Sequence, residues 1–284
     1  MTRVAYQGQP GAFGEDAVIG WFGDDVEPMP VTTFPAVMHA VESGEADAGV
    51  LPLENSLAGT VGDALDALAD GSLRVIGEVL LPVRHQLLVR PGATIDDVER
   101  VSSHWQALAQ CERFLAARGW DVVPAADTAG AARELAAQGD FTTAAIASRR
   151  AAARYGLEVA AADIQDADHN LTRFAVLVAD GAADPPEPHG ALAPRGEARE
   201  TLITFETGHR PGDLYRALGA LAEAGINLSR IESRPSGGGP WRYRFLVQVT
   251  GDAGTEPLHG ALAALAQHTS SMRVLGSFDT EGPV

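Results

Sequence analysis

The feature that most restricts the fold is an alternation of short apolar runs with amphipathic stretches, which continues from residue 1 to residue 179. The apolar runs have the length and β-branched content of strands, and the stretches between them repeat with helical spacing. Such an alternation is typical of an α/β fold with largely parallel sheets. We expect strands at 3–6, 48–51, 75–89, 121–124, 142–147 and 173–178, and helices at 15–22, 35–43, 61–69, 106–117, 128–138 and 148–155.

A polar, proline-rich segment without periodicity interrupts this pattern between residues 182 and 199. Such a segment is typical of a linker. From residue 200 to residue 280 the order becomes strand, helix, strand, strand, helix, strand, which is that of a ferredoxin-like sandwich. We therefore predict two domains, residues 1–181 and 200–280, joined by a linker at 182–199.

The net charge of −17 excludes several classes of function. Nucleic acid is bound through clustered cations, so we expect no nucleic-acid partner. The long-range field also repels anions, and an anionic substrate would need a well-built local site. All 21 basic residues are arginines. Without lysine the chain cannot form a Schiff base or build the P-loop of a nucleotide hydrolase.

The sequence also indicates the compartment. No apolar run approaches the ~20 residues that span a bilayer, and the amino terminus lacks an apolar signal segment. The single cysteine, Cys111, cannot form an internal disulfide or join a multi-cysteine metal site. The eight histidines show no metal-ligand spacing. We expect a cytoplasmic protein without a membrane partner, metal or cofactor.

Residues 168–174, DHNLTRF, place a hydroxyl, a guanidinium and an aromatic ring side by side before an apolar strand. The Arg173 guanidinium could bind a carboxylate through two parallel hydrogen bonds. Phe174 would begin the strand and form an apolar wall. A polar turn that leads into a strand is the competing interpretation, and composition alone favours it.

Residues 52–61, PLENSLAGTV, lie between a predicted strand and a predicted helix, where free amides and the positive helix end attract anions. Asn55, Ser56 and Thr60 add side-chain donors, and Gly59 lets a ligand approach closely. A helix start capped by Ser56 or Thr60 explains the string equally well.

Residues 102–111, SSHWQALAQC, begin another predicted helix. Ser103 fits the N-cap, and Gln106 and Gln110 are four residues apart, so both lie on one face near the helix start. An anion site is again one interpretation. Helix capping is the other, and it explains Ser103 but not the two glutamines. Residues 8–14, GQPGAFG, form a glycine-rich turn that includes Gly11 but lacks the spacing of a dinucleotide fingerprint.

Together and in this order, the strings resemble the motifs of the prephenate dehydratase family. Residues 52–61 match its P-x-E-N-S-x-x-G-x-V motif, and residues 170–174 match its N-x-T-R-F signature. Residues 103–111 follow its S-H-P-Q-A-L-x-Q-C motif with Trp105 in place of the proline, and Gly14 replaces a serine or threonine in its glycine-rich turn. Residues 226–235, INLSRIESRP, resemble the effector string of an ACT domain.

The resemblance implies two α/β lobes, similar to periplasmic binding proteins, with the active site in the cleft between them. Lobe one would comprise about residues 1–80 and 173–181, and lobe two about residues 81–172. The implied activity is dehydration and decarboxylation of prephenate to phenylpyruvate in L-phenylalanine biosynthesis, with no cofactor. An arogenate dehydratase and a non-catalytic two-lobed sensor are the alternatives.

The resemblance also implies roles for the site residues. Thr172 would donate a proton or hydrogen bond to the leaving oxygen, Arg173 would hold a carboxylate, and Phe174 would shape the pocket. Glu54 would repel the substrate if ionised and could act as an acid if protonated. Ser103 and Gln110 complete the predicted catalytic set. The predicted substrate-binding set is Asn55, Ser56, Gly59, Thr60, Gln106, Asn170 and Gly11.

For the ACT unit, the resemblance implies L-phenylalanine as a feedback effector and a homodimer or homotetramer formed through this unit. Asp213 departs from the family's P-G-A-L motif, and an acid there could change the preferred aromatic effector. Alternatively, Glu232 and Arg234 form a local ion pair and the unit only joins copies of the chain. The predicted effector contacts are Pro211, Gly212, Asp213, Leu214, Asn227, Leu228, Glu232, Ser233 and Arg234.

Overall fold

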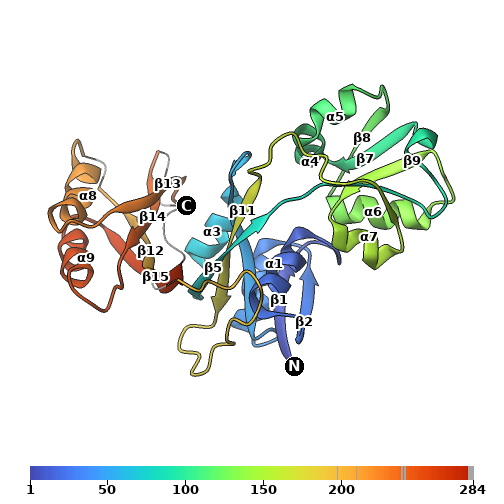
Figure 1. The fold of residues 1–284 in the computed structure, drawn as a ribbon. Helices are drawn as coiled ribbons and strands as arrows, with labels where there is room; N and C mark the ends of the chain where they lie inside the picture. Colours follow the sequence, from blue (N-terminus) through green and yellow to red (C-terminus); the bar gives the residue numbers. More distant parts are fainter. Residues whose placement is uncertain (197, 209, 238, 240, 281–284) are drawn as a thin grey trace.

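The computed structural model describes residues 1–196, 198–208, 210–237, 239 and 241–280. These residues form three sheets with their helices. Figure 1 shows lobe one in the centre, lobe two at the upper right and the carboxy-terminal unit on the left. Among these residues, none of the helices has the length and hydropathy that a bilayer crossing requires.

Lobe one is a mixed sheet with helices on both faces. Its elements are β1 Thr2–Gln7, α1 Phe13–Phe22, β2 Val26–Val31, α2 Phe34–Glu42, β3 Ala48–Asn55, β4 Gly59–Thr60, α3 Gly62–Asp70, β5 Arg74–Pro82 and β11 Leu171–Val178. The strand order is β2-β1-β3-β11-β5, and β4 pairs with β3. Helix α1 packs on one face, and α2 and α3 pack on the other, because each presents an apolar stripe to the sheet.

Lobe two repeats this architecture. Its elements are β6 Gln86–Val89, a 3-10 turn Ile95–Asp97, β7 Arg100–His104, α4 Trp105–Gln110, α5 Glu112–Ala116, β8 Asp121–Ala125, α6 Thr128–Ala137, β9 Thr143–Ala147, α7 Arg149–Tyr155 and β10 Glu158–Ala161. The strand order is β10-β6-β9-β7-β8. The predicted helix at 106–117 is interrupted at Cys111, where α4 ends and α5 begins.

Two segments connect the lobes, one from β5 to β6 and one from β10 to β11. Because the chain leaves lobe one along β5 and returns along β11, these neighbouring strands are antiparallel, and so are β6 and β10. The expectation of largely parallel sheets is therefore wrong. The sheet of each lobe has a parallel half and an antiparallel half.

The carboxy-terminal unit contains one antiparallel sheet. Its elements are β12 Ala198–Glu206, α8 Asp213–Glu223, β13 Leu228–Pro235, β14 Tyr243–Thr250, α9 Leu258–Ala266 and β15 Ser271–Thr280. The strand order is β13-β14-β12-β15. The two-lobed α/β region and the ferredoxin-like unit predicted from the sequence are thus confirmed.

The predicted linker is bonded to lobe one. The amides of His189 and Gly190 donate to the Trp21 carbonyl at 3.0 and 2.7 Å, and the Leu192 amide donates to the Gly20 carbonyl at 2.7 Å. These bonds satisfy carbonyls near the end of α1. The linker therefore lies along lobe one, and β12 begins at Ala198, inside the segment predicted to be linker.

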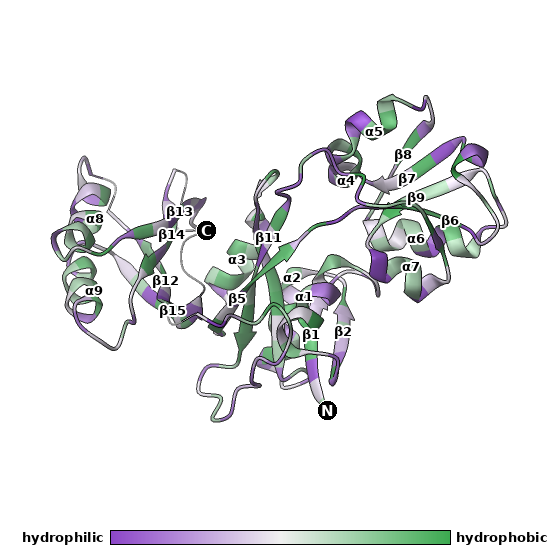
Figure 2. Cartoon of the chain, in the orientation of Figure 1, coloured by the Kyte–Doolittle hydropathy of each residue, from purple (hydrophilic) through white to green (hydrophobic). Residues whose placement is uncertain are grey.

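One face of the third sheet packs directly on lobe one. Four of its side chains belong to the buried cluster that α2, α3 and β5 form, namely Leu202, Leu246, Leu275 and Phe278. In Figure 2 the ribbons of β5 and β11 are largely green, as expected for strands that are buried on both faces. The sheet of the carboxy-terminal unit is thus held against the strands that connect the lobes.

Gly276 of β15 tests this contact, because a Cβ atom there would lie 1.9 Å from the carbonyl oxygen of Val75 on β5. We expect Gly276→Ala to force the sheet away from lobe one and to lower the free energy of unfolding by about 1–3 kcal/mol in chemical denaturation. Gly219→Ala in α8 is the matched control, since no atom lies within 4 Å of a Cβ there. A Gly276→Ala protein as stable as the wild type would contradict the contact.

Candidate active site

A cleft of about 460 Å³ lies between the two lobes. Residues of β1, β3 and β11 line it from lobe one, and the starts of α4 and α6 line it from lobe two. Helices α1, α2, α3 and α6, each of nine or ten residues, begin at its edge. Their free amides and positive dipole ends favour an anionic ligand.

The cleft has few charged side chains. Within the described part of the chain, no arginine lines it, and Asp127 is its one carboxylate. Asp127 caps α6 through a 2.6 Å hydrogen bond from the Gly130 amide. Across the described ranges, no cluster of three or more His, Cys, Asp or Glu side chains is placed to hold a metal ion. A bound anion would therefore be held by helix ends and neutral donors.

A hydrogen-bonded network of side chains joins the lobes at this cleft. Asn55, at the end of β3, donates from Nδ2 to Asn170 Oδ1 at 2.8 Å and to Thr172 Oγ1 at 3.0 Å. Its Oδ1 accepts from the amides of Leu57 and Ala58 at 3.1 and 2.9 Å. These backbone donors fix which end of the Asn55 amide faces Thr172.

Gln110 of α4 extends the network into lobe two. Its Oε1 accepts from Asn170 Nδ2 at 2.9 Å, and its Nε2 donates to Asn55 Oδ1 at 3.4 Å. The same Oε1 lies 2.8 Å from His85 Nε2. Because an amide oxygen can only accept, His85 carries its proton on Nε2.

The Thr172 hydroxyl is oriented by this network. Its oxygen accepts from Asn55, and no second partner for it is found among the residues that the structure describes. The hydroxyl hydrogen is therefore available to a ligand. Since Thr172 lines the cleft, it can donate to an oxygen bound there.

Strand β11 places Thr172 and Arg173 on opposite sides of the sheet. Thr172 and Phe174 line the cleft, whereas the Arg173 side chain faces the carboxy-terminal unit. There Arg173 NH1 donates to Glu78 Oε2 at 2.6 Å. The expectation that Arg173 holds a carboxylate in the cleft is not met, because successive side chains of a strand point to opposite faces.

The same alternation separates Glu54 from Asn55 on β3. Asn55 lines the cleft, and Glu54 lines a cavity of about 610 Å³ on the other side, with Arg173. Glu54 Oε2 lies 3.4 Å from Nε of Arg230. The structure thus places this predicted acid away from the cleft.

The other predicted residues divide into two groups. Gly59, Thr60, Gln106 and Gln110 line the cleft together with Asn55, Thr172 and Phe174. Ser103 is fully buried and donates to the Ile146 carbonyl at 2.6 Å, and Ser56 donates to the His169 carbonyl at 2.7 Å. Gly11 lies against α7, where a Cβ would come within 2.8 Å of the Ala151 Cα. Asn170 is buried and reaches the site through the network.

Five polar residues of the cleft were not predicted as site residues from the sequence, namely Gln7, His85, His104, Asp127 and Thr128. His85 is a lone histidine in the apolar run at 75–89, and that isolation was the available signal. His104 and Asp127 are the N-caps of α4 and α6. Their convergence depends on the order of strands in the sheet of lobe two, which local motifs do not determine.

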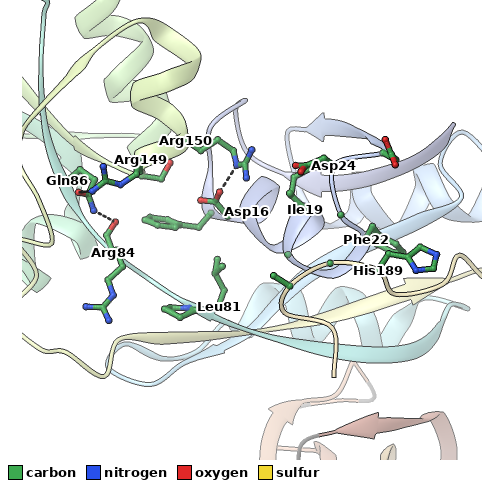
Figure 3. A pocket seen from close by; sticks show the side chains of 18 of the residues that line it. Asp16, Ile19, Phe22, Asp24, Leu81, Arg84, Gln86, Arg149, Arg150 and His189 are labelled. Atoms are coloured by element: carbon green, nitrogen blue, oxygen red, sulfur yellow. Dashed lines mark hydrogen bonds and ion pairs between the residues drawn. The ribbon is translucent and has the colours of Figure 1, made fainter. Parts of the chain in front are cut away.

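A larger cavity of about 880 Å³ lies on the other face of the outgoing connection (Figure 3). Arg84 lines it, whereas its neighbours Val83 and His85 line the cleft, because side chains alternate along the extended chain. Figure 3 shows the Arg150 guanidinium directed at Asp16, and the two groups lie 2.5 Å apart. This pair joins α7 of lobe two to α1 of lobe one. The wall of this cavity thus contains an ion pair that holds the two lobes together.

His85 and His104, the two histidines of the cleft, predict that the free energy of unfolding depends on pH. Burial lowers the pKa of His85, although the Gln110 hydrogen bond opposes this, and burial lowers the pKa of His104. Each ring therefore takes up a proton at a lower pH in the folded protein than in the unfolded chain. We expect their contribution to stability to be complete above pH ~6.5 and to be lost as the pH falls, by at most ~1.4 kcal/mol per pH unit for each ring.

Chemical denaturation of the wild type and of His85→Gln between pH 7.5 and pH 5 measures this effect. The variant should lose stability less steeply than the wild type on acidification, because one of the depressed groups is gone. Equal slopes would show that His85 does not titrate differently in the folded and unfolded states.

Comparisons with known proteins agree with this geometry. Residues 4–182 match the prephenate dehydratase family, and residues 201–267 match the ACT domain. An arogenate dehydratase/prephenate dehydratase of Arabidopsis thaliana is 40% identical over 289 residues, which cover 99% of this chain and 73% of the relative. A bifunctional N-acyl-homoserine lactone acylase/prephenate dehydratase of Komagataeibacter europaeus is 36% identical over 279 residues, which cover 97% of this chain and 95% of the relative.

A solved prephenate dehydratase of Arthrobacter aurescens, in complex with L-Phe, is similar over the whole chain. Its TM-score is 0.88 at 34% identity, and the similarity covers 100% of this chain and 92% of that chain. Both the sequence matches and this structure include the two-lobed region and the carboxy-terminal sheet. The chain therefore belongs to the prephenate dehydratase family, and it is a dehydratase, a carbon–oxygen lyase, with a carboxy-terminal ACT domain.

Proposed function

We propose that the cleft binds prephenate and releases phenylpyruvate, carbon dioxide and water. The ring carboxylate leaves as carbon dioxide, its bonding electrons enter the ring, and the ring hydroxyl departs with its own bonding pair. One proton must reach that hydroxyl for it to leave as water. Because aromatisation of the ring supplies the driving force, the protein has to orient the dianion and assist the departing oxygen.

The observation that carries this proposal is the orientation of the Thr172 hydroxyl. Asn55 donates to its oxygen at 3.0 Å, so its hydrogen is free for the leaving oxygen of the substrate. A threonine hydroxyl is a weak acid. We therefore assign Thr172 a hydrogen bond that stabilises the negative charge developing on the leaving oxygen, with water as the final source of the proton.

Helix ends and neutral donors would hold the two carboxylates of prephenate. Thr60 precedes α3, Thr128 begins α6, and Gln106 lies in the first turn of α4, and all three line the cleft. These local donors have to overcome the repulsion of a chain with a net charge of −17. Phe13 and Phe174 line the same cleft and supply apolar surface for the ring.

Substitution of Thr172 tests the assigned role. We expect Thr172→Val, which keeps the shape and removes the hydroxyl, to lower kcat by about 10²–10³-fold with a small change in KM. Thr172→Ser keeps the hydroxyl and should retain most of the activity. Phenylpyruvate absorbance measures turnover, and circular dichroism confirms that each variant is folded. Wild-type kcat in Thr172→Val would remove Thr172 from the mechanism.

Arogenate, in which an amino group replaces the keto group of prephenate, is a second candidate substrate. Asp127 favours it, because this carboxylate lines the cleft and no arginine lies within ion-pair distance among the described residues. An ammonium group would find its counter-charge there, whereas prephenate carries only negative charges. The kcat/KM of the purified protein for each compound ranks the two substrates, and turnover of neither would overturn the proposed function.

We also propose that the ACT domain binds L-phenylalanine as a feedback effector, as supported by the Arthrobacter relative solved with L-Phe. Residues 211–214 lie at the start of α8, whereas Asn227 and Leu228 follow its end. Since α8 has 11 residues, these two groups are separated by about 16 Å of helix. A second copy of the chain could bring them together, which supports a homodimer or homotetramer formed through this domain.

The edge of the ACT sheet is suited to such an assembly. Strand β13 is an edge strand, and its residue Ile231 is 45% exposed. An exposed edge strand can pair with the same strand of another copy. Arg234 binds Asp66 of α3 through two hydrogen bonds of 2.9 and 2.6 Å. The alternative of a local pair between Arg234 and Glu232 is therefore wrong, and Arg234 instead ties the ACT domain to lobe one.

A buried group of side chains connects the ACT domain to the catalytic strand. Glu78 of β5 accepts at Oε2 from Arg173 at 2.6 Å and from Gln248 Nε2 of β14 at 3.0 Å. Glu78 and Gln248 are 8% and 1% exposed. Arg173 is next to Thr172 on β11. We propose that effector binding shifts the ACT sheet and changes the position of Thr172 through these contacts.

Gln248→Met tests this connection, because it removes the hydrogen bonds that Gln248 Nε2 donates to Glu78 and Glu200 and nearly preserves the volume. We expect kcat without phenylalanine to stay within about twofold, and the phenylalanine concentration for half-inhibition to rise roughly three- to tenfold. Gln267→Met, at the exposed end of α9, is the matched control. A phenylalanine response equal to that of the control would contradict the proposed connection.

The cytoplasmic location stays a prediction from the sequence. The name of the Arabidopsis thaliana relative places that protein in the chloroplast. Fractionation of cells that produce the protein would test the location.

A further inference from the structure

One histidine that the mechanism above does not use lies between the two lobes. His85 follows β5 and precedes β6, is 2% exposed and lines the cleft. Its amide donates to Gln165 Oε1 at 2.9 Å, and its carbonyl accepts from the Ile164 amide at 2.9 Å. Both partners belong to the returning connection. The position of the His85 backbone is thus fixed by both segments that cross between the lobes.

The imidazole ring is fixed as well. Its Nε2 lies 2.8 Å from Gln110 Oε1, and the ring meets Phe13 edge-to-face with centroids 5.6 Å apart. Burial lowers the pKa of His85, which favours the neutral ring. The Gln110 amide oxygen then places the ring proton on Nε2. Within the described residues, its buried Nδ1 has no hydrogen-bond partner. The contact with Gln110 is therefore the polar contact that this ring makes.

This contact and the one from Asn170 together determine how the Gln110 amide is turned. An amide side chain can rotate by half a turn and exchange its oxygen for its NH2 group, unless its partners distinguish the two. His85 and Asn170 both donate to Gln110 Oε1, at 2.8 and 2.9 Å. A rotated Gln110 would face both donors with its own NH2 group. His85 and Asn170 thus direct the Gln110 NH2 group at Asn55.

Asn55 transmits this orientation to the reacting side chain. Its Oδ1 accepts from Gln110 Nε2 at 3.4 Å, and its Nδ2 donates to Thr172 Oγ1 at 3.0 Å. Each residue therefore donates a hydrogen bond to the next: His85 to Gln110, Gln110 to Asn55, and Asn55 to Thr172. The Thr172 hydrogen is the end of this series and faces the cleft.

We propose that His85 is a positioning residue for dehydration: the proton on its Nε2 fixes the Gln110 amide. The Gln110 NH2 group, together with the Leu57 and Ala58 amides, then holds Asn55 Oδ1 and keeps Asn55 Nδ2 directed at the Thr172 hydroxyl. His85 acts through Gln110 and touches no reacting atom. The inference rests on the proposed function of the cleft, and it concerns kcat rather than substrate binding, because the interaction it supports is made with the leaving oxygen.

Two substitutions separate the donor from the packing of the ring. His85→Phe keeps a ring against Phe13 and removes the donor, and we expect kcat to fall about 10–50-fold while KM changes less than about twofold. His85→Gln places an amide NH2 group near the position of Nε2, and it should restore kcat to within about threefold of the wild type. If both variants lose the same activity, or if His85→Phe keeps wild-type kcat, the inference is overturned.

A double-mutant cycle tests whether His85 acts through Gln110. In a Gln110→Met protein, the further change His85→Phe should lower kcat by less than about twofold, since the group that His85 positions is already absent. A loss equal to that seen in the wild-type background would mean that His85 acts independently, which contradicts the inference.

Control measurements distinguish three outcomes: a variant that is misfolded, a wrong proposed function, and a wrong role for His85. His39→Gln, on the exposed side of α2, controls for the general loss of a histidine. Thermal unfolding reports a purely structural role, which lowers Tm without the selective rescue by glutamine. If the wild type turns over neither prephenate nor arogenate, the proposed function is wrong. If the wild type is active and His85→Phe is equally active, only the role of His85 is wrong.

Discussion

The two faces of strand β11 determine how the rest of the protein is arranged around the cleft. Pairing with β3 on one side and β5 on the other holds β11 in the middle of the lobe-one sheet. Alternation then directs Thr172 to the cleft and Arg173 to the ACT domain. A displacement of Arg173 also displaces Thr172, because the two residues are neighbours on one paired strand. In the proposed function, chemistry and regulation would therefore depend on adjacent residues.

The distribution of charge follows from that arrangement. The arginines of β13 and β14 bind lobe one: Arg230 meets Glu54, Arg234 binds Asp66, and Arg244 lies 2.5 Å from Asp70. The cleft, in contrast, offers helix ends, amides and hydroxyls. A fixed set of amide dipoles needs little reorganisation when charge moves within the substrate, which suits a reaction in which one carboxylate disappears and a hydroxyl leaves.

The sequence predicted most elements of the fold, but it did not predict strands β2, β4, β7 and β10. Strand β2, VEPMPV, contains two prolines and is an edge strand, so its composition does not indicate a strand. Strand β7, RVSSH, is short and half polar. The run at 75–89 reads as one strand, yet Pro82 ends β5 and residues 83–85 turn the chain into lobe two. Hydrophobic periodicity reports burial, and these segments obtain their burial from neighbours that are distant in sequence.

The sequence by itself determined the α/β class and the ferredoxin-like unit, because hydrophobic periodicity is a local property of the chain. Its ordered motifs indicated the family, and that resemblance implied the two lobes. It also placed Asn55, Gln110 and Thr172 among the site residues, where the structure brings them into one network. Only the tertiary structure decided that Arg173 and Glu54 face away from the cleft and that His85 faces into it. The side to which a strand residue points depends on how the strand is paired and on which domain covers each face, and neither is present in a motif.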